Sequence, residues 1–543
     1  SNFSLLTSSQ QNALNTNIGG VNDGQGANRV AWLRGDKSTE LAQGGSFRNR
    51  SAGILGDIIN SDLFFVRSLN FGYDGLVSGT PGQTTYYNYV QANESRTPVI
   101  YTGANDGMLH AFNADTGVEL FSYVPSSVYS KLSSLTSPNY THRYIVDGNA
   151  YAGDAYIGAT PSWRTILLGT TGGGGKGIFA LDITDPTNFS ASNVLWEFTD
   201  ADLGYVHGQA KIAILNNGDW VAIISNGYNS TSDKAFLYIV NLQTGALIKK
   251  IATNSTTSNG LSAPALVDTN GDKMIDYVYA GDLQGNVWKF DISHTNTSQW
   301  DVAYGSGGTK YPLFTARNSS NQVQPITSPL EIGVHPNGGF FIYFGTGQFI
   351  ASGDNTNTQV QTLYGIWDNG TRISETNRST LQQQTIETQT TSSPFRRTVS
   401  TNAVNWASKR GWYMDLLKPP SSSNQGERSI VMPLLNFGRI LFTTLIPSSD
   451  PCASGGSNWV MLLNGETGGM LTAPHFDTDK NGLLNSSDQI IAGVGSDGVR
   501  SESVAISAGN LLHLIAGTTT GSVETITVSG NPLTPRRSWR QIQ

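Results

Sequence analysis

Cysteine is almost absent from this sequence, and charged residues are few. The single thiol, Cys452, has no partner for an internal disulfide and cannot build a cysteine-rich metal site. The seven histidines show neither the His-x-x-x-His spacing nor the cysteine neighbours of a zinc site. Charged residues make up 13% of the chain, the net charge is -7, and no basic block occurs. This balance excludes a nucleic-acid-binding surface.

Long apolar runs and catalytic patterns are missing as well. No stretch approaches the ~20 apolar residues that a membrane-spanning helix needs. Residues 172–177 form a glycine-rich run, but Gly177 stands after Lys176 where a phosphate-binding loop requires Ser or Thr. No Gly-x-Ser-x-Gly elbow occurs in a strand–turn–helix context. The sequence therefore predicts a protein that is not an enzyme and has no direct membrane span.

The chain begins with Ser1-Asn-Phe-Ser, which is not the charged-then-apolar start of a signal peptide. The composition is nevertheless typical of an extracellular protein. We therefore expect a fragment of a longer exported chain, with a cytosolic protein as the alternative.

The sequence is rich in the residues of β-structure. It contains 61 Gly, 21 Phe and 11 Trp, and Val, Ile, Tyr, Thr and Trp recur in short runs that Gly, Asn and Asp interrupt. This is an all-β pattern.

A repeated unit appears from about residue 97 onward. Each copy has an apolar strand that ends near a glycine, a turn, and a second apolar or aromatic strand. We expect the glycine to let the hairpin turn tightly. Seven copies are visible, anchored at Gly103, Gly169, Gly227, Gly281, Gly345, Gly455 and Gly517. Most intervals are about 60 residues, which is room for about four strands and their loops.

A four-stranded sheet repeated radially is a propeller blade. The sequence thus predicts a seven-bladed β-propeller over 91–543, with an N-terminal segment, 1–90, that packs on or closes it. The one long interval contains 369–406, which is rich in Thr, Gln, Ser and Arg. We expect this polar stretch to be a surface insertion or a flexible loop.

The early loop, residues 268–276, has the spacing of a calcium site. Its oxygen-bearing residues occupy positions 1, 3, 5 and 9, and position 7 adds a backbone carbonyl. The predicted ligands are Asp268, Asn270, Asp272, Met274 (carbonyl) and Asp276. An all-oxygen anionic cage suits Ca²⁺ better than Mg²⁺, which keeps its waters, or Zn²⁺, which prefers His and Cys. An ordinary Asp/Asn/Gly turn is the alternative.

The late loop, residues 477–488, matches an EF-hand-type spacing, with Gly482 at the sharp turn. The predicted ligands are Asp477, Asp479, Asn481, Leu483 (carbonyl), Asn485 and Asp488. The last position is Asp rather than Glu, which reaches less far and weakens affinity. A polar surface turn is the alternative.

The triplet Arg34-Gly35-Asp36 follows Trp32-Leu33, which we expect to hold it against the core. In a projecting loop, integrins read such a triplet through its Asp carboxylate and its Arg. A buried or ordinary turn sequence is the alternative.

Several stretches together resemble the C-terminal propeller domain of the PilC/PilY-type proteins of type IV pili, and the resemblance spans nearly the whole chain. The matching stretches are Trp32-Leu-Arg-Gly-Asp36, Leu55-Gly-Asp-Ile-Ile-Asn-Ser61, Gly103-Ala-Asn-Asp-Gly-Met-Leu-His-Ala-Phe112, His142-Arg-Tyr-Ile-Val-Asp-Gly148, the early loop, Gly281-Asp-Leu-Gln-Gly-Asn-Val-Trp-Lys-Phe-Asp291 and Asp450-Pro-Cys-Ala-Ser-Gly-Gly456.

This resemblance implies a modified seven-bladed propeller of the quinoprotein type, preceded in the family by an N-terminal half that often holds a von Willebrand A-like domain. It implies a surface protein of a Gram-negative bacterium, at the pilus tip or outer membrane, with minor and major pilins as partners. It also implies calcium binding at the early loop, opposition to pilus retraction, twitching motility, virulence, and adhesion to a host integrin or another receptor through Arg34-Gly35-Asp36.

Two alternatives remain at this point. In a calcium-braced adhesin, the metal would only stabilise the propeller. A quinone-dependent dehydrogenase has a similar repeat pattern, but those enzymes typically carry a vicinal disulfide, which a single cysteine cannot form.

Overall fold

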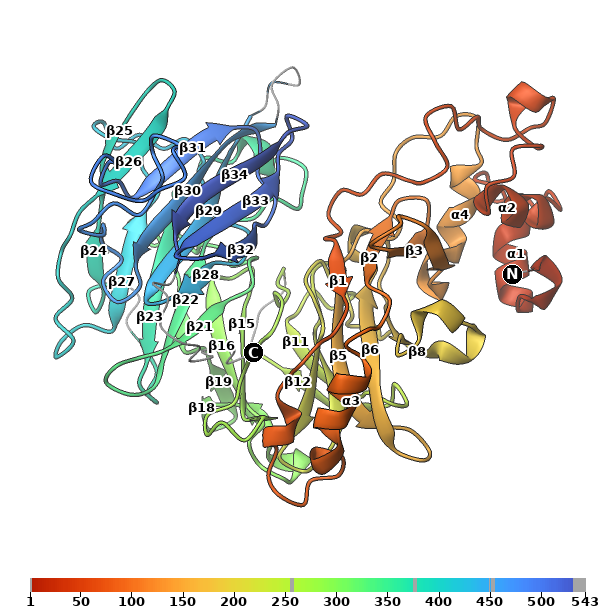
Figure 1. Ribbon diagram of the computed structural model, residues 1–543, viewed down its shortest axis with the longest axis horizontal. Helices are drawn as coiled ribbons and strands as arrows, with labels where there is room; N and C mark the ends of the chain where they lie inside the picture. Colours follow the sequence, from red (N-terminus) through yellow and green to blue (C-terminus); the bar gives the residue numbers. More distant parts are fainter. Residues whose placement is uncertain (1, 254–257, 375–377, 449, 451–454, 531–543) are drawn as a thin grey trace. The chain divides into compact units, whose positions relative to one another are not determined.

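The computed structural model describes residues 2–253, 258–374, 378–448, 450 and 455–530 (Figure 1). These residues form two compact units. The first unit contains the residues up to Pro264 together with 268–276 and 292–300. The second contains 265–267, 277–291 and the residues from Asp301 onward.

Three sheets form the β-structure of the first unit. The first has the order β1 (Phe64–Val66), β2 (Val99–Ala104), β3 (Met108–Asn113), β4 (Glu119–Tyr123). The second has the order β5 (Ala150–Ile157), β6 (Ser162–Thr170), β7 (Ile178–Asp182), β8 (Val194–Phe198). The third has the order β12 (Leu247–Ala252), β11 (Phe236–Asn241), β10 (Trp220–Ser225), β9 (Lys211–Leu215), β14 (Met274–Ile275).

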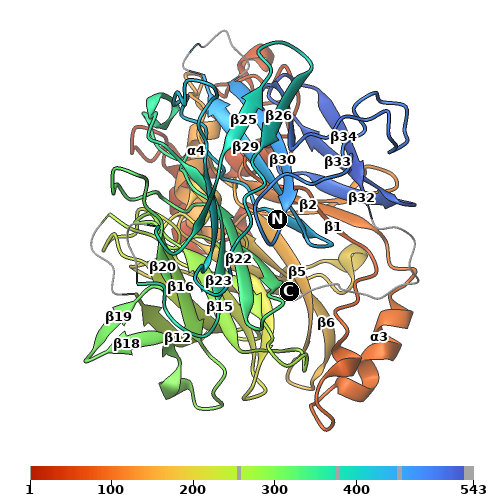
Figure 2. The same ribbon diagram turned by 90° about the vertical axis from the view of Figure 1, so that its left-hand side faces the viewer.

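Four larger sheets and a hairpin form the second unit. The first sheet contains β13 (Ala265–Val267), β15 (Tyr277–Gly281), β16 (Asn286–Asp291), β17 (Asp301–Val302) and β20 (Phe314–Thr315), and the hairpin joins β18 (Tyr304–Ser306) to β19 (Thr309–Tyr311). The next sheet has the order β21 (Glu331–Val334), β22 (Phe340–Gly345), β23 (Thr362–Asp368), β27 (Gly411–Asp415), β24 (Gln382–Gln384). The third has the order β25 (Ile386–Gln389), β26 (Phe395–Val399), β31 (Gly493–Asp497), β30 (Gly456–Asn464), β29 (Arg439–Pro447), β28 (Leu434–Asn436). In the last sheet β32 (Val504–Ala508), β33 (Leu511–Gly517) and β34 (Val523–Ser529) lie side by side (Figure 2).

The seven predicted repeats are confirmed as the seven larger sheets of the described residues. Each predicted strand pair is an antiparallel pair within one sheet: β2–β3, β6–β7, β10–β11, β15–β16, β22–β23, β29–β30 and β33–β34. Alternating apolar residues and the glycine-containing turns thus predicted the centre of every sheet.

The role expected for the anchoring glycines is wrong at five of them, because Gly103, Gly169, Gly281, Gly345 and Gly517 lie in strands and have no positive φ angle. Gly103 and Gly281 lie within extended strands, and the positive φ angles belong to Gly107 (98°) and Gly285 (74°) in the turns. A Cβ on Gly281 would lie 2.3 Å from Ile326, and one on Gly103 would lie 2.7 Å from a backbone carbonyl. Glycine is needed at these two positions because neighbouring chain packs directly against them.

Residues 1–90 share the first unit with the residues that follow them. The helices α1 (Ser8–Asn15) and α2 (Gly26–Leu33) lie beside α4 (Tyr129–Leu135), and β1 pairs with β2 (Figure 1). Their contact buries Leu14 and Trp32 against Leu132 and Leu135. The helix α3 (Tyr86–Ala92) places Tyr86 against Trp163 of β6. This segment therefore adds both a strand and a helical cover.

The polar stretch 369–406 is not a flexible loop throughout, which corrects the expectation from its composition. It contains β24, β25 and β26, which join two sheets of the second unit. β24 and β25 are edge strands, whereas β26 lies between β25 and β31. Successive side chains of a strand point to opposite faces of the sheet, so polar residues can alternate with residues that face the core. Eight described residues of this stretch are buried: Ile373, Arg378, Leu381, Gln384, Ile386, Arg397, Val399 and Ser400.

The core consists of apolar clusters within each unit. In the first unit, Ile166, Leu168, Ile212 and Ile224 pack together. Burial of each such side chain contributes about 1.5–3 kcal/mol. Among the helices of the described chain, none combines the length and apolarity that crossing a bilayer requires.

Asp154 is a buried carboxyl whose ionisation opposes folding. It is 1% exposed in β5, where it accepts hydrogen bonds from the hydroxyls of Tyr86 and Thr165, both at 2.8 Å. Burial raises the pKa of Asp154 to about 6, although those hydroxyls and the charge of Arg96 act in the opposite direction. Because the folded state binds this proton more tightly, stability falls as pH rises from about 4 to about 6.

We predict that Asp154→Asn stabilises the protein at pH 7.5. The lost ionisation cost is on the order of 2–3 kcal/mol, so the melting temperature rises by roughly 5 °C. The variant's stability also depends less steeply on pH between pH 4 and 6. Thermal melts at several pH values measure both effects, with the exposed Asp115→Asn as the matched control. A less stable variant at pH 7.5 that keeps the wild-type slope would contradict this assignment.

Candidate metal centres

The early loop connects two paired strands of one sheet, as the repeat pattern predicts. β13 ends at Val267, which pairs with Tyr277 of β15. The end of the loop forms β14, which pairs in parallel with β9. Asp, Asn and Gly favour a turn here because they accept local N–H bonds and tolerate left-handed backbone.

In the early loop, side-chain oxygens of alternate residues accept hydrogen bonds from the loop's own backbone. Asp268 Oδ2 accepts from the N–H of Lys273 at 2.8 Å. Asn270 Oδ1 accepts from Asp272 at 3.0 Å, and Asp272 Oδ1 accepts from Met274 at 2.8 Å. These bonds hold the oxygens within the turn. Each oxygen keeps a second lone pair that is able to bind a cation.

The late loop repeats this hydrogen-bond pattern position by position. Asp477 Oδ2 accepts from the N–H of Gly482 at 3.0 Å. Asp479 Oδ1 accepts from Asn481 at 3.2 Å, and Asn481 Oδ1 accepts from Leu483 at 2.8 Å. In both loops the donors stand five, two and two positions after the residues whose oxygens accept.

The backbone conformations of the two loops agree as well. In the early loop the fourth and sixth residues, Gly271 and Lys273, have φ angles of 80° and 72°. In the late loop the same positions, Lys480 and Gly482, have φ angles of 58° and 78°. Glycine and lysine exchange places, but both loops begin with the same left-handed turn. The nine-residue and twelve-residue spacings therefore belong to one structural motif.

A buried aspartate closes each loop and is held by the threonine at position 2. Asp276 accepts from the N–H and the hydroxyl of Thr269 at 2.9 and 2.5 Å. Asp488 accepts from the N–H and the hydroxyl of Thr478 at 2.7 and 3.1 Å. The two aspartates are 6% and 5% exposed. Asp276 is therefore the structural counterpart of Asp488.

Opposing effects act on the carboxyl of Asp488. Burial raises its pKa, but the N–H groups of Asn485 and Thr478 outweigh that effect and hold the pKa below its ordinary value. The carboxylate therefore stays ionised at neutral pH. An ionised carboxylate is the form that binds a cation.

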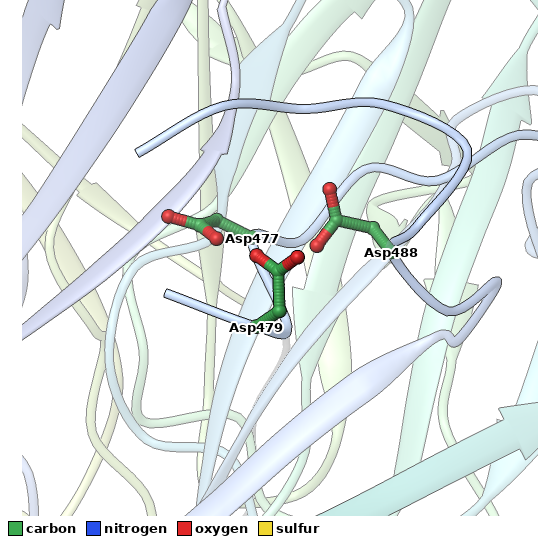
Figure 3. A group of neighbouring side chains, drawn as sticks. All are labelled: Asp477, Asp479 and Asp488. Atoms are coloured by element: carbon green, nitrogen blue, oxygen red, sulfur yellow. The ribbon is translucent and has the colours of Figure 1, made fainter. Parts of the chain in front are cut away.

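The late loop gathers its three carboxylates at one point. In the described part of the chain, Asp477, Asp479 and Asp488 form the group of acidic residues that each offer one carboxylate oxygen within 4.8 Å of the others (Figure 3). Calcium–oxygen distances of about 2.3–2.6 Å place two ligands of one ion at most about 5 Å apart. The late loop therefore has the spacing of a metal-binding triad, while the carboxylates of the early loop do not meet this spacing.

Three further predicted ligands, Met274, Leu483 and Asn485, have different local surroundings. Met274 lies in β14, and its side chain is buried. The side chain of Leu483 is exposed, and its N–H is bonded to Asn481. Asn485 Oδ1 accepts from the N–H of Ser487 at 2.8 Å, so this side chain caps a local turn.

The sequence pattern did not identify three residues that hold the closing acids. Thr269 and Thr478 carry one shared signal, because each directly follows the first aspartate of its loop. Asn216 carries none. It lies 60 residues before Asp276, in the turn after β9, and donates to Asp276 Oδ1 at 2.9 Å.

The Arg34-Gly35-Asp36 triplet directly follows the helix α2, and Arg34 is the C-cap of that helix. The N–H of Asp36 donates to Ala31 at 3.0 Å, and Gly35 has a φ angle of 104°. The side chains of Arg34 and Asp36 are exposed, and Trp32 is buried, as expected. The N–H and the hydroxyl of Ser38 hold the pKa of Asp36 below its ordinary value.

Three stretches that carry the family resemblance meet within the first unit. Asn105 donates its N–H to the carbonyl of Asp57 at 3.0 Å, and its side-chain oxygen accepts from Ile145 at 2.9 Å. His142 Nε2 lies 2.7 Å from Asp57 Oδ2. Cys452, in the late stretch, lies outside the described residues.

Comparison with known proteins agrees with this arrangement of seven sheets. A family profile described as the PilY1 beta-propeller domain matches residues 55–399, more than half of the chain. The chain belongs to this PilY1 β-propeller family. Its fold is a seven-bladed β-propeller. The family is one of pilus proteins and not of quinone-dependent dehydrogenases, which removes the enzyme alternative.

Individual relatives are longer than this chain. A protein of Xylella fastidiosa, named type IV pilus biogenesis factor PilY1 homolog, is 44% identical over 464 residues, which cover 81% of this chain and 31% of the relative. The type IV pilus biogenesis factor PilY1 of Pseudomonas aeruginosa strain PAK is 37% identical over 528 residues, covering 89% and 44%. The chain therefore spans less than half the length of these relatives.

A solved structure extends the similarity to three dimensions. The crystal structure of the Pseudomonas aeruginosa PilY1 C-terminal domain superimposes with a TM-score of 0.70 and 31% sequence identity, covering 86% of this chain and 99% of that domain. The chain thus corresponds to the C-terminal propeller of a PilY1 protein.

Proposed function

We propose that this chain is the propeller region of a type IV pilus biogenesis factor that binds Ca²⁺ and, in its calcium-bound form, opposes pilus retraction. The family and the similarity to the PilY1 C-terminal domain support the pilus role. One observation carries the calcium part: three carboxylates of the late loop lie within 4.8 Å on a turn that the early loop shares.

The carboxylates of the early loop are structurally linked to the pairing of β14 with β9. Bound Ca²⁺ supplies the positive charge that offsets the repulsion among Asp268, Asp272 and Asp276. Asp276 is held by Thr269 and Asn216, and the residues just before it form β14 on β9. An ordered loop therefore stabilises this pairing. Repulsion among bare carboxylates loosens it.

A switch of this kind requires a partner that distinguishes the two states. We propose that components of the pilus machinery, including minor and major pilins, bind the ordered state more tightly. Extension then exceeds retraction, and surface pili, twitching motility and host-cell adhesion follow. The corresponding location is the cell surface, at the pilus tip or outer membrane of a Gram-negative bacterium.

Variants of Asp276 test this function. In the full-length protein, we expect Asp276→Ala, which imitates the empty loop, to reduce surface pili and twitching several-fold. Asp276→Lys, whose cation imitates bound calcium, is expected to retain pili without responding to calcium depletion. Pilus counts and twitching zones measure both, and thermal melts of the purified chain control for unfolding. Normal twitching and unchanged surface pili in both variants would refute the switch.

A calcium-braced adhesin is the second candidate, and the exposed side chains of Arg34 and Asp36 favour it. In that function, calcium only stabilises the fold, and adhesion depends on the triplet. Calcium removal would lower the melting temperature without changing the number of pili. Asp36→Glu would then reduce binding to purified integrin, with pilus counts unchanged.

A further inference from the structure

A cavity of about 270 Å³ lies in the first unit, at the end of α2. Its walls come from separate stretches of chain: Trp32 and Leu33 of α2, residues 48–57, Asn105 and Asp106, and Leu135 and Tyr140. The cavity contains none of the calcium-loop residues. It is large enough for one or two amino-acid side chains of a ligand.

Arg48 is the unpaired charge in the lining of this cavity. The other charged lining residues already have partners of opposite charge or imidazole partners: Arg50–Glu40 at 2.8 Å, Asp57–His142 at 2.7 Å and Asp106–His110 at 3.1 Å. Arg48 forms no such pair with any residue that the structure describes. Arg48 is therefore the charged residue of the lining that has no ion-pair partner among the described residues.

The guanidinium of Arg48 is held in a fixed plane. It lies 4.2 Å from the ring centre of Tyr140 and 5.6 Å from that of Trp32. Nε donates to the carbonyl of Leu135 at 3.0 Å, and within the described chain the two terminal nitrogens have no acceptor. A planar guanidinium with open N–H groups binds a carboxylate through two parallel hydrogen bonds.

The backbone beside Arg48 offers further donors. Residues 51–55 are exposed and line the cavity, and their N–H groups donate to no acceptor among the residues described. Ile54 and Leu55 are 46% and 49% exposed, which is unusual for such large apolar side chains. An extended polypeptide would satisfy the backbone groups and cover these two side chains.

We propose that this cavity binds an acidic residue in an extended segment of a partner polypeptide. The carboxylate of that residue pairs with the guanidinium of Arg48. Its apolar neighbours pack on Ile54 and Leu55, and its backbone bonds to residues 51–55. A carboxylate fits better than a doubly charged phosphate, because Asp57 and Asp106 also line the cavity. This binding does not require calcium and goes beyond the proposed pilus switch.

Fluorescence anisotropy with short dye-labelled peptides tests this proposal on the complete 543-residue chain. One peptide contains Leu-Asp-Leu and has an amidated C-terminus. A matched peptide contains Leu-Asn-Leu, and a third contains Leu-Asn-Leu with a free terminal carboxylate. We expect the Asp peptide to bind about tenfold more tightly than its Asn counterpart. Tighter binding of the third peptide would also support the site and assign the carboxylate to a chain terminus.

Arginine variants test whether the preference for the Asp peptide depends on Arg48. Arg48→Gln is expected to bind the Asp and Asn peptides equally, and Arg48→Lys to keep part of the preference because it keeps the charge without the planar fork. The exposed Arg143→Gln, outside the cavity lining, serves as the matched control and should bind as wild type. Circular dichroism confirms that each variant is folded. Equal binding of all three peptides by the wild type, or an unchanged preference in folded Arg48→Gln, overturns the proposal.

Discussion

Replacing Glu427 with glutamine is expected to lower the free energy of unfolding of the second unit by about 3–5 kcal/mol. Glu427 accepts two hydrogen bonds from Arg397, both at 2.6 Å, and another from Thr444 at 2.6 Å. Arg397 is 0% exposed and lies 3.9 Å from the ring centre of Trp459. Removing the carboxylate charge leaves the arginine buried without a counter-charge, which is the source of the large cost.

Urea unfolding followed by tryptophan fluorescence measures this loss, because Trp459 is beside the buried pair. The exposed pair of Asp301 with Lys310 supplies the control, and Asp301→Asn should change stability by less than about 1 kcal/mol. The double variant Arg397→Met, Glu427→Met should recover most of the loss, since it removes both charges. If Glu427→Gln unfolds within about 1 kcal/mol of wild type, the pair contributes no more than a surface pair does.

Calorimetric titration with Ca²⁺ is expected to resolve two sites in the wild-type chain. Asp488→Ala should abolish binding to the late loop, because it removes both a carboxylate and the acceptor that Thr478 holds. Asp276→Ala should abolish the early site and leave the late site intact. The late site should bind more tightly, since its three carboxylates are already gathered and need less rearrangement.

Two further variants control this titration. Thr478→Val keeps every proposed ligand but removes a hydroxyl from Asp488, so we expect affinity to fall about 10–100-fold at the late site alone. Asp268→Ala should affect the early site alone. A wild-type titration that Asp488→Ala leaves unchanged would mean that the late loop is only a polar turn. If Asp276→Ala leaves the titration unchanged, the early loop is only a polar turn.

The sequence was most informative where structure is local. Apolar alternation and turn glycines predicted the centre of each sheet, because strand pairing across a short hairpin is encoded within about 20 residues. The spacing of Asp and Asn at positions 1, 3 and 5 identified both acidic loops, because alternate residues of a tight turn present their oxygens to one side. Both loops also begin with Asp-Thr, and this local signal marks the threonine that holds the closing aspartate.

Other features depend on residues that are far apart in the chain. The three strands within 369–406 were not predicted, because a polar strand forms wherever a neighbouring strand offers backbone groups for pairing. Gly281 packs against Ile326, which no turn rule anticipates. Asn216 reaches Asp276 only because β9 and β14 pair. The Arg397–Glu427 pair joins residues that are 30 positions apart.

The sequence by itself determined the all-β class, the number of blades, the two oxygen-rich loops and the resemblance to pilus proteins. Each of these features depends on the periodicity or spacing of residues within a short stretch of sequence. Only the tertiary structure decided that the two loops are one motif and that the late loop gathers its carboxylates. It also decided that Arg48 lines a cavity without an ion-pair partner among the described residues. Those features depend on contacts between residues that are distant in the sequence, and only the folded chain brings these residues together.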